Sequence, residues 1–262
     1  SMRIVESVFN DIQFDEEIAM VPSNSETQFE EEYISLRKKE GRWYSEKELG
    51  TLPKVNKDHL HYGEWKIRKH SADAFISSIK SDVNADSIIL EVGCGNGWLS
   101  NYISKGVKCN VLGIDINLTE LKLANTHFTS DKAQFVFAEL FSPEFKKKSL
   151  DLIVLAASVQ YFKDFNLLIN RAKEILKDNG QIHIFNSPFY QNQHQADLAF
   201  QRSLDYYGAM GYPEMCKHYF HRTRMELLVF NFKIKLSGRS INDKIKRKLG
   251  FPISSFPWII IE

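Results

Sequence analysis

Cysteine is scarce in this chain: 262 residues contain only Cys94, Cys109 and Cys216. None of them belongs to a Cys-x-x-Cys pair or to a Cys/His cluster with zinc-ligand spacing, which excludes a disulfide framework and a structural zinc site. His59 and His61 lack a third ligand at useful spacing, so we expect no bound metal. Few, scattered cysteines are typical of proteins from a reducing compartment, and we expect a cytoplasmic protein.

An excess of charge of one sign is also missing. Lys and Arg total 34 and Asp and Glu total 33, so the formal net charge is +1 and no overall field attracts nucleic acid or anionic lipid. The apolar runs, such as 151–157, are as short as a strand, whereas a membrane-spanning helix needs roughly 20 residues. We therefore expect neither nucleic acid nor membrane as a partner. The oligomeric state stays open.

What the chain does have is enough apolar sequence, 43%, for one good-sized core. Residues 1–63 are polar with interspersed aromatics, and we expect an appendage of short helices that covers the core as a lid. Residues 64–262 are the main domain. They open with a helix over 64–80, in which Trp65, Ala72 and Phe75 recur at helical spacing.

Strand and helix patterns alternate from residue 87 to residue 186. Strands are expected over 87–92, 110–115, 134–138, 151–156 and 181–186. Helices are expected over 99–104, 118–128 and 165–176, with Asn117 and Glu120 as a capping-box start for the second and Asn179-Gly180 as the turn that ends the last. Alternation of this kind predicts a doubly wound α/β fold with a mostly parallel sheet.

The alternation stops after the fifth strand. Residues 187–219, rich in aromatics and histidines, predict an insert on the substrate side with a helix over 196–210. Beyond it we expect a helix over 222–230, a strand over 232–237, a basic solvated loop at 244–248 and a strand over 258–262. The last two strands would form an antiparallel pair that completes a seven-stranded sheet.

Three glycines follow the first strand of the alternation, at Gly93, Gly95 and Gly97. A glycine turn between a strand and a helix brings bare backbone and a positive helix terminus against a ligand. A dinucleotide fingerprint needs its third glycine at position 98, where this chain has Trp98. The spacing G-x-G-x-G therefore disfavours a nicotinamide-dependent oxidoreductase, which remains an alternative.

The segment Glu91-Val92-Gly93-Cys94-Gly95-Asn96-Gly97 resembles motif I of class I S-adenosylmethionine-dependent methyltransferases. The later segments 112–116, 137–140, 150–156 and 176–181 match that family's further motifs in order. The resemblance covers residues 64–186 and implies S-adenosylmethionine as cofactor and S-adenosylhomocysteine as product. The predicted cofactor-binding residues are Glu91, Gly93, Cys94, Gly95, Asn96, Gly97, Asp115, Ile116, Glu139, Leu140, Ala156 and Arg68.

Within that set the resemblance implies particular roles. Asp115, at the end of the second strand, accepts hydrogen bonds from the ribose hydroxyls, and Ile116 packs on the adenine. Glu139 lies near the adenine amino group. Arg68 is expected on a different ground: the segment 59–69 lies just before the core, and we expect it to fold over the open side of the cofactor, where Arg68 meets the carboxylate. We interpret Cys94 as a packing residue and not as a nucleophile, because no histidine accompanies it in sequence.

The acceptor side is less defined. The family frequently carries a histidine near position 160, but this chain has Gln160, which cannot act as a general base. If the acceptor must lose a proton, the candidates for catalytic groups are His194, His218 and His221, with Tyr161 as an orienting group. We expect a small-molecule or saccharide acceptor, methylated at oxygen or nitrogen. The alternatives are a protein that binds the cofactor without methyl transfer, and a nucleic-acid or protein methyltransferase.

Overall fold

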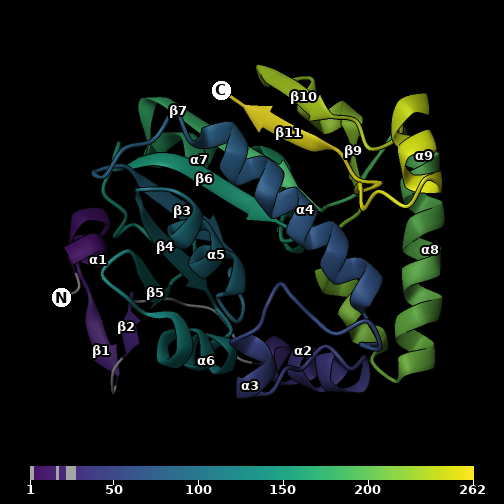
Figure 1. The fold of residues 1–262 in the computed structure, drawn as a ribbon, viewed down its shortest axis with the longest axis horizontal. Coiled ribbons are helices and arrows are strands. Elements are labelled where there is room, and N and C mark those ends of the chain that lie inside the picture. The colour runs from purple at the N-terminus through teal and green to yellow at the C-terminus, as the bar shows by residue number, and fades with distance from the viewer. Residues whose placement is uncertain (1–2, 16–17, 22–27) are drawn as a thin grey trace.

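The structure is a computed structural model of the chain and describes residues 3–15, 18–21 and 28–262. The described residues form a nine-stranded sheet in the order β1-β2-β5-β4-β3-β6-β7-β11-β10 and a separate pair, β8-β9 (Figure 1). The strands are β1 Gln13–Asp15, β2 Ile18–Met20, β3 Ile88–Val92, β4 Asn110–Asp115, β5 Ala133–Phe137, β6 Leu150–Ala156, β7 Leu176–Phe185, β8 Phe189–Tyr190, β9 Arg222–Thr223, β10 Phe232–Leu236 and β11 Trp258–Ile261.

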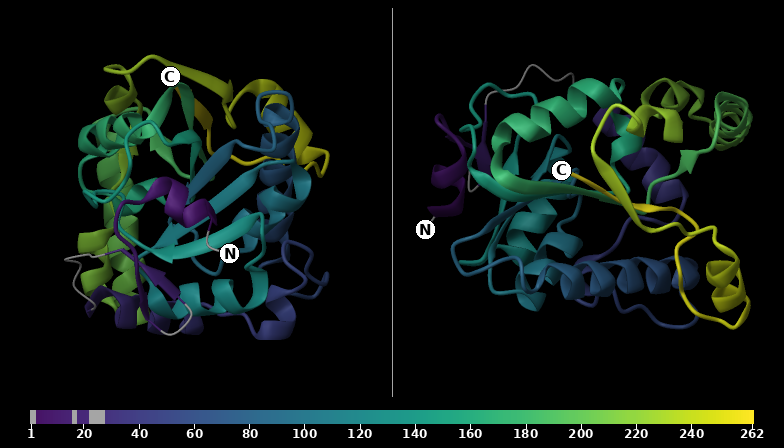
Figure 2. Two further views of the ribbon diagram at one scale, coloured as in Figure 1. Left: turned by 90° about the vertical axis from the view of Figure 1, so that its left-hand side faces the viewer. Right: turned by 90° about the horizontal axis from the view of Figure 1, so that it is seen from above.

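Helices cover both faces of the sheet. The α-helices are α1 Arg3–Val8, α2 Gln28–Lys39, α3 Glu46–Leu49, α4 Tyr62–Ile79, α5 Trp98–Gly106, α6 Leu118–Phe128, α7 Phe165–Ile175, α8 Gln193–Met210 and α9 Ile241–Lys248, and the 3₁₀ helices are η1 Val159–Tyr161, η2 Pro213–His218 and η3 Arg224–Leu227. Apolar side chains of α1 and α7 pack on one face of the sheet, and those of α4 and α5 pack on the other (Figure 2). Double coverage explains why all five residues of β3 are buried.

The sheet confirms the predicted fold class. In the order β2-β5-β4-β3-β6-β7, every strand is parallel to its neighbours in the sheet. Strand β11 pairs antiparallel with both β7 and β10. The seven predicted strands form the part of the sheet with the order β5-β4-β3-β6-β7-β11-β10. The two N-terminal strands extend that sheet: β2 pairs in parallel with β5, and β1 forms the antiparallel edge.

The division into an appendage, a main domain and an insert stays a prediction. Part of the 1–63 segment lies outside the described residues. Its described portion is not purely helical, because β1 and β2 belong to the sheet while α2 and α3 lie by α6 (Figure 1). The predicted helix over 196–210 is α8, which begins earlier, where the Asn192 side chain accepts a hydrogen bond from the Gln195 amide.

Two sequence predictions near the C-terminus are wrong. Residues 222–230 do not form one helix: Arg222 and Thr223 form β9, which pairs with β8, and only the short η3 follows. The 244–248 segment is not a loop but lies in α9. Ser240 and Asp243 form a capping box that starts this helix, and lysine and arginine are good helix formers.

Two smaller expectations are also corrected. Asn117 caps α6 by accepting from the Glu120 amide, but the Glu120 side chain does not return to the cap. Asn179 and Gly180 do not end α7, which stops at Ile175, because β7 already begins at Leu176 and contains both residues. The described helices include none that is long and apolar enough to cross a bilayer.

Candidate active site

A cavity of about 380 Å³ lies at the carboxyl ends of β3, β4 and β6 and the segment after β5. Its inner wall is the glycine loop after β3 together with the residues that follow β4, β5 and β6. Its outer wall comes from α2, α4 and the segment between them. The carboxyl edge of a parallel sheet is where open α/β folds bind ligands. Of the predicted cofactor-binding residues, only Gly97 does not line this cavity.

The glycine loop needs its glycines for two physical reasons. The φ angles of Gly93, Gly95 and Gly97 are +75°, +51° and +79°, a region that side chains disfavour. A Cβ at Gly93 would lie 2.8 Å from the Cβ of Ser158, and a Cβ at Gly97 would lie 2.7 Å from that of Ala124. The loop can therefore pack closely against the segment after β6 and against α6, and still present bare backbone to the cavity.

Asp115 locks this loop to the end of β4. Its Oδ2 accepts a hydrogen bond from the Gly95 amide at 2.7 Å, and its Oδ1 accepts from the Asn117 amide at 2.9 Å. Burial raises the pKa of Asp115 in spite of these amide donors. Beside it, Ile116 is 40% exposed and offers an apolar surface to the cavity. A carboxylate oxygen has a second lone pair, so Asp115 can still accept from a ligand.

Glu91 is buried behind the loop. Its Oε2 accepts a hydrogen bond from the Ser100 hydroxyl at 2.5 Å, which ties β3 to α5. Burial raises the pKa of Glu91 to about 8. Cys94 is also buried, and burial raises the pKa of its thiol well above the usual value, which keeps it a neutral thiol. That environment agrees with a packing role for Cys94.

Glu120 is a cavity residue that the sequence did not reveal. It lies on the first turn of α6 beside the glycine loop, so close that a Cβ at Gly95 would be 3.2 Å from its Oε2. Burial, and then the charge of Asp115, raise the pKa of Glu120 to about 7. Glu120 lies three residues after the N-cap Asn117, and this spacing predicted a carboxylate that caps the helix. It did not predict a carboxylate that lines the cavity.

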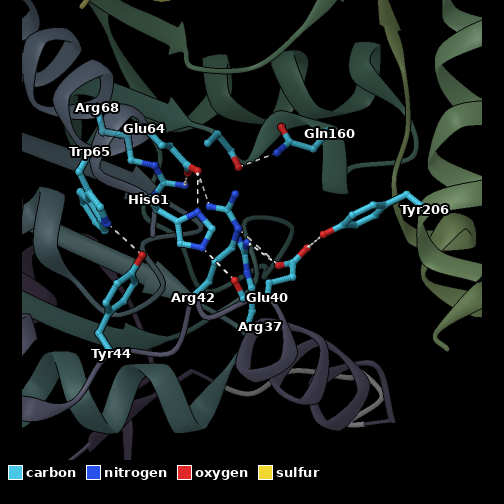
Figure 3. Close-up of polar contacts among 11 residues, drawn as sticks. Arg37, Glu40, Arg42, Tyr44, His61, Glu64, Trp65, Arg68, Gln160 and Tyr206 are labelled. Carbon is cyan, nitrogen blue, oxygen red and sulfur yellow. Dashed lines mark hydrogen bonds and ion pairs between the residues drawn. The ribbon is translucent and has the colours of Figure 1, made fainter. Parts of the chain in front are cut away.

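Arg68 lies on α4 at the outer wall, in a charged group that Figure 3 shows. Glu64 Oε1 pairs with Arg68 at 2.6 Å, and Glu64 Oε2 pairs with Arg42 at 2.5 Å. The Arg68 guanidinium also lies 5.0 Å from the centroid of Trp65, whose indole N–H donates to the Tyr44 hydroxyl at 2.9 Å. Glu64 thus holds both arginines with N–H donors to spare for a ligand anion.

A third arginine, Arg37 on α2, also lines the cavity. It lies 4.9 Å from the centroid of the Tyr33 ring and 3.4 Å from Glu40 Oε2. Glu40 Oε1 in turn accepts from the Tyr206 hydroxyl on α8 at 2.6 Å (Figure 3). The Tyr33 ring lies edge-on to Tyr161, which lines the cavity from η1. This wall joins α2, η1 and the insert, and no sequence motif marks it.

The candidate catalytic residues do not gather in one place. Tyr161 lines the cavity, whereas His194, His218 and His221 are not among its lining residues. His194 and His218 are exposed on α8 and η2. His221 lies within 3.0 Å of the Ser203 hydroxyl, and burial lowers its pKa. The catalytic roles stay predictions, and Tyr161 alone has the position that its role requires.

Gln160 has a structural position. Its Nε2 donates to the Ala157 carbonyl at 2.7 Å, and its Oε1 accepts from the Ser187 hydroxyl at 2.9 Å (Figure 3 draws the first contact). Its backbone carbonyl accepts from the Phe220 amide at 2.7 Å. Gln160 therefore joins η1 to both ends of the predicted insert and holds the segment that carries Tyr161.

Known proteins resemble this chain in sequence. Residues 90–184 match the family described as "Methyltransferase domain". The malonyl-[acyl-carrier protein] O-methyltransferase of Acetivibrio thermocellus is 26% identical over 116 residues, which are 44% of this chain and 41% of that protein. Phosphoethanolamine N-methyltransferase 1 of Triticum aestivum is 25% identical over 178 residues, 66% of this chain and 36% of that protein. The chain thus matches under half the length of these relatives.

Solved structures share the fold. Geranyl diphosphate C-methyltransferase from Streptomyces coelicolor A3(2), in complex with Mg²⁺, geranyl diphosphate and S-adenosylhomocysteine, superposes with a TM-score of 0.53 at 15% identity. The alignment covers 79% of this chain and 86% of that one. A geranyl diphosphate methyltransferase in complex with S-adenosylmethionine gives a TM-score of 0.54 at 12% identity, covering 79% and 91%. Residues 90–184 thus match a methyltransferase domain, and the sheet that carries the glycine loop and Asp115 shares the fold of these solved methyltransferases.

Proposed function

We propose that this chain transfers a methyl group from S-adenosylmethionine to a small or medium-sized acceptor, at oxygen or nitrogen. The observation that carries the proposal is the composition of one cavity, in which the glycine loop and Asp115 face an outer wall of arginine and tyrosine side chains. Its volume of about 380 Å³ is near the lower end for ligand pockets, roughly 300–1,000 Å³, which favours a small acceptor beside the cofactor.

The lining residues fit the cofactor's chemical groups. Asp115 has acceptor capacity for the ribose hydroxyls, and Ile116 has apolar surface for the adenine. Arg68 has N–H donors for the carboxylate. The carboxyl groups of Glu91 and Glu120 favour a ligand that carries positive charge, because a cation nearby offsets the burial of their ionised forms.

The bound cofactor would supply an activated methyl group on a sulfonium, so the protein's part is to align the acceptor and exclude water. Tyr161 is the residue best placed to orient the acceptor, because it lines the cavity beside the loop after β6. The names of the relatives give no single acceptor: they include an O-methyltransferase, an N-methyltransferase and a sterol C-methyltransferase.

Calorimetric titration with S-adenosylhomocysteine tests the cofactor site. Asp115→Ala should weaken binding about tenfold to a hundredfold, since hydrogen bonds to a charged group contribute about 1.5–3 kcal/mol. Asp115→Asn keeps one acceptor oxygen and should lose less. Asp131, exposed in a loop, supplies the matched control Asp131→Ala. Unchanged affinity in Asp115→Ala would remove the proposed ribose contact.

Methyl transfer itself is tested with labelled S-adenosylmethionine and fractionated cell extract. Label in the small-molecule fraction supports the proposal. Label in protein or nucleic acid supports the alternative of a protein or nucleic-acid methyltransferase. Cofactor binding without any labelled product favours a binding protein that performs no transfer, an alternative supported by Gln160 in place of a histidine. Binding of a nicotinamide dinucleotide without binding of S-adenosylhomocysteine would restore the oxidoreductase alternative.

A further inference from the structure

The helix α9 has its polar side toward the protein. The Asp243 carboxylate accepts from the Ser237 hydroxyl at 3.2 Å and caps the helix start with Ser240. One turn further on, Arg247 donates to the Gly238 carbonyl at 2.6 Å and to the Ser254 carbonyl at 3.3 Å. Hydrogen bonds to the Asp243 carboxylate and from the Arg247 guanidinium therefore hold α9 in place, where most surface helices use an apolar face.

The apolar side of α9 faces away from the protein. Ile241, Ile245 and Leu249 are 78%, 51% and 70% exposed, and Phe251 directly after the helix is 55% exposed. A spacing of four residues places the first three on one stripe, and at 100° per residue this stripe lies opposite Asp243 and Arg247. The helix is thus amphipathic, but its apolar side faces solvent and its polar side faces the protein.

Lysines border this stripe on both sides. Lys244 and Lys248 lie on one flank and Lys246 on the other, and all three are exposed. Within the part of the chain that the structure describes, no hydrogen bond or ion pair joins their ammonium groups to another residue. Long lysine side chains can extend past an apolar surface and keep their charge in a polar layer.

We propose that α9 docks this protein onto the surface of an anionic lipid bilayer. A helix that lies in a membrane interface has an apolar face for the acyl boundary and basic residues for the headgroups, which is the pattern that Ile241, Ile245 and Leu249 form with the lysines. Lysine is depleted from protein–protein interfaces, and nucleic acid has no use for an exposed apolar stripe. The lipid surface alone matches both properties.

The position of α9 permits this contact. The helix lies at the margin of the molecule, beyond the end of the sheet, in both views that show it clearly (Figures 1 and 2). Docking there adds a surface contact and no membrane-spanning segment, and it departs from our expectation, drawn from the net charge of +1, that the chain has no membrane partner. The proposal does not depend on methyl transfer, because none of the α9 residues lines the cavity.

Vesicle co-sedimentation with the full chain tests the proposal. The protein should bind vesicles made of equal parts phosphatidylcholine and phosphatidylglycerol, bind phosphatidylcholine vesicles far less, and dissociate in high salt. Replacing Lys244, Lys246 and Lys248 together by glutamine should weaken binding about a hundredfold, since each lysine near an anionic surface contributes roughly fivefold. Failure of the unaltered protein to bind the anionic vesicles at low salt would overturn the proposal.

The apolar contribution needs its own variant. Replacing Ile241, Ile245 and Leu249 together by glutamine should weaken vesicle binding about tenfold or more. These side chains are exposed, so the variant should keep its thermal midpoint. The same replacement of Met225, Leu228 and Val229, which are 64–68% exposed around η3, is the matched control and should leave binding unchanged.

Charge needs a matched control too. Replacing the exposed Lys47, Lys54 and Lys57 by glutamine removes the same charge elsewhere and should change binding little. Equal losses in the control and the α9 lysine variant would overturn the proposal, because overall charge would then suffice. So would a dimer abolished by the apolar variant, which would make α9 an interface between two copies, or RNA binding that needs the lysines but not the apolar stripe.

Discussion

Replacing Glu120 by glutamine should make folding stability less dependent on pH. Burial and the neighbouring Asp115 raise the pKa of Glu120 from 4.5 to about 7. Below pH 4.5 the carboxyl is protonated in both the folded and the unfolded chain, and no free energy is lost. Between pH 4.5 and 7 the unfolded chain ionises first, so the folded state loses stability as the pH rises. The full loss, at most about 3 kcal/mol, is reached above pH 7.

Urea unfolding of both proteins at a series of pH values measures this effect. At pH 4 the free energies of unfolding of the unaltered protein and Glu120→Gln should nearly agree, because the carboxyl is then largely protonated in both states. At pH 8 the variant should be more stable, by about 3 kcal/mol at most. Glu46→Gln, at an exposed position on α3, is the control and should shift stability by the same small amount at each pH. Parallel curves for the Glu120 variant and the unaltered protein would refute the reasoning.

The same carboxyl should influence ligand binding in the opposite direction. A ligand that donates hydroxyl groups or carries positive charge near Glu120 binds the ionised carboxylate better. Affinity for S-adenosylhomocysteine should therefore rise with pH through about 7 in the unaltered protein. In Glu120→Gln the part of this rise that belongs to Glu120 should disappear, whereas the part from Glu91, whose pKa is about 8, should remain. The variant would then be more stable and bind more weakly at pH 8, which separates a binding role from a purely structural one.

Three further predictions concern Arg68 and Trp65 in the wall of the cavity and Gly97 beside it. Arg68→Ala should weaken calorimetric binding of S-adenosylhomocysteine about tenfold but leave binding of 5′-methylthioadenosine, which lacks the carboxylate, unchanged; equal losses for both ligands would contradict the proposed contact. Trp65→Phe removes the donor to the Tyr44 hydroxyl in a site where Trp65 is 1% exposed, and should lower the free energy of unfolding by about 1–3 kcal/mol in urea. Gly97→Ala should lower the free energy of unfolding by roughly 2 kcal/mol or more, because Gly97 has a φ of +79° and an added Cβ would lie 2.7 Å from the Cβ of Ala124. Gly63→Ala in α4, where an added Cβ meets open space, should raise it by about 0.5–1 kcal/mol. Similar thermal midpoints for the two variants would refute this prediction.

The central strands and helices could be predicted closely because their local signals agree. The predicted bounds of β4 and α6 are those observed, since a buried apolar run ends at Asp115 and an asparagine cap follows at once. Most of the predicted cofactor-binding residues line one cavity for a related reason. Their positions follow from strand ends, and parallel strands bring their carboxyl ends to one edge of the sheet.

Apart from Arg68, the residues on the outer wall could not be predicted, because they reach the cavity through tertiary packing. Tyr33 and Arg37 lie on a polar helix of the N-terminal segment, and nothing in their spacing places α2 over the glycine loop. The error at α9 has a different cause. The segment 244–248 is basic and lacks the apolar periodicity of a helix with a buried face, so the sequence favoured a loop. The capping box of Ser240 and Asp243 was the signal for a helix.

The three carboxyl groups around the glycine loop share one property, a pKa that burial raises. Burial raises the pKa of Glu91, Asp115 and Glu120, so their ionised forms are costly in the protein alone. A core selected only for stability would replace them by neutral side chains of similar volume. Their presence in one cavity, beside bare glycine backbone, is therefore best explained by a ligand that compensates the charge. A ligand with hydroxyl donors and positive charge, such as the proposed methyl donor, meets that requirement, whereas a dinucleotide pyrophosphate would add negative charge to it.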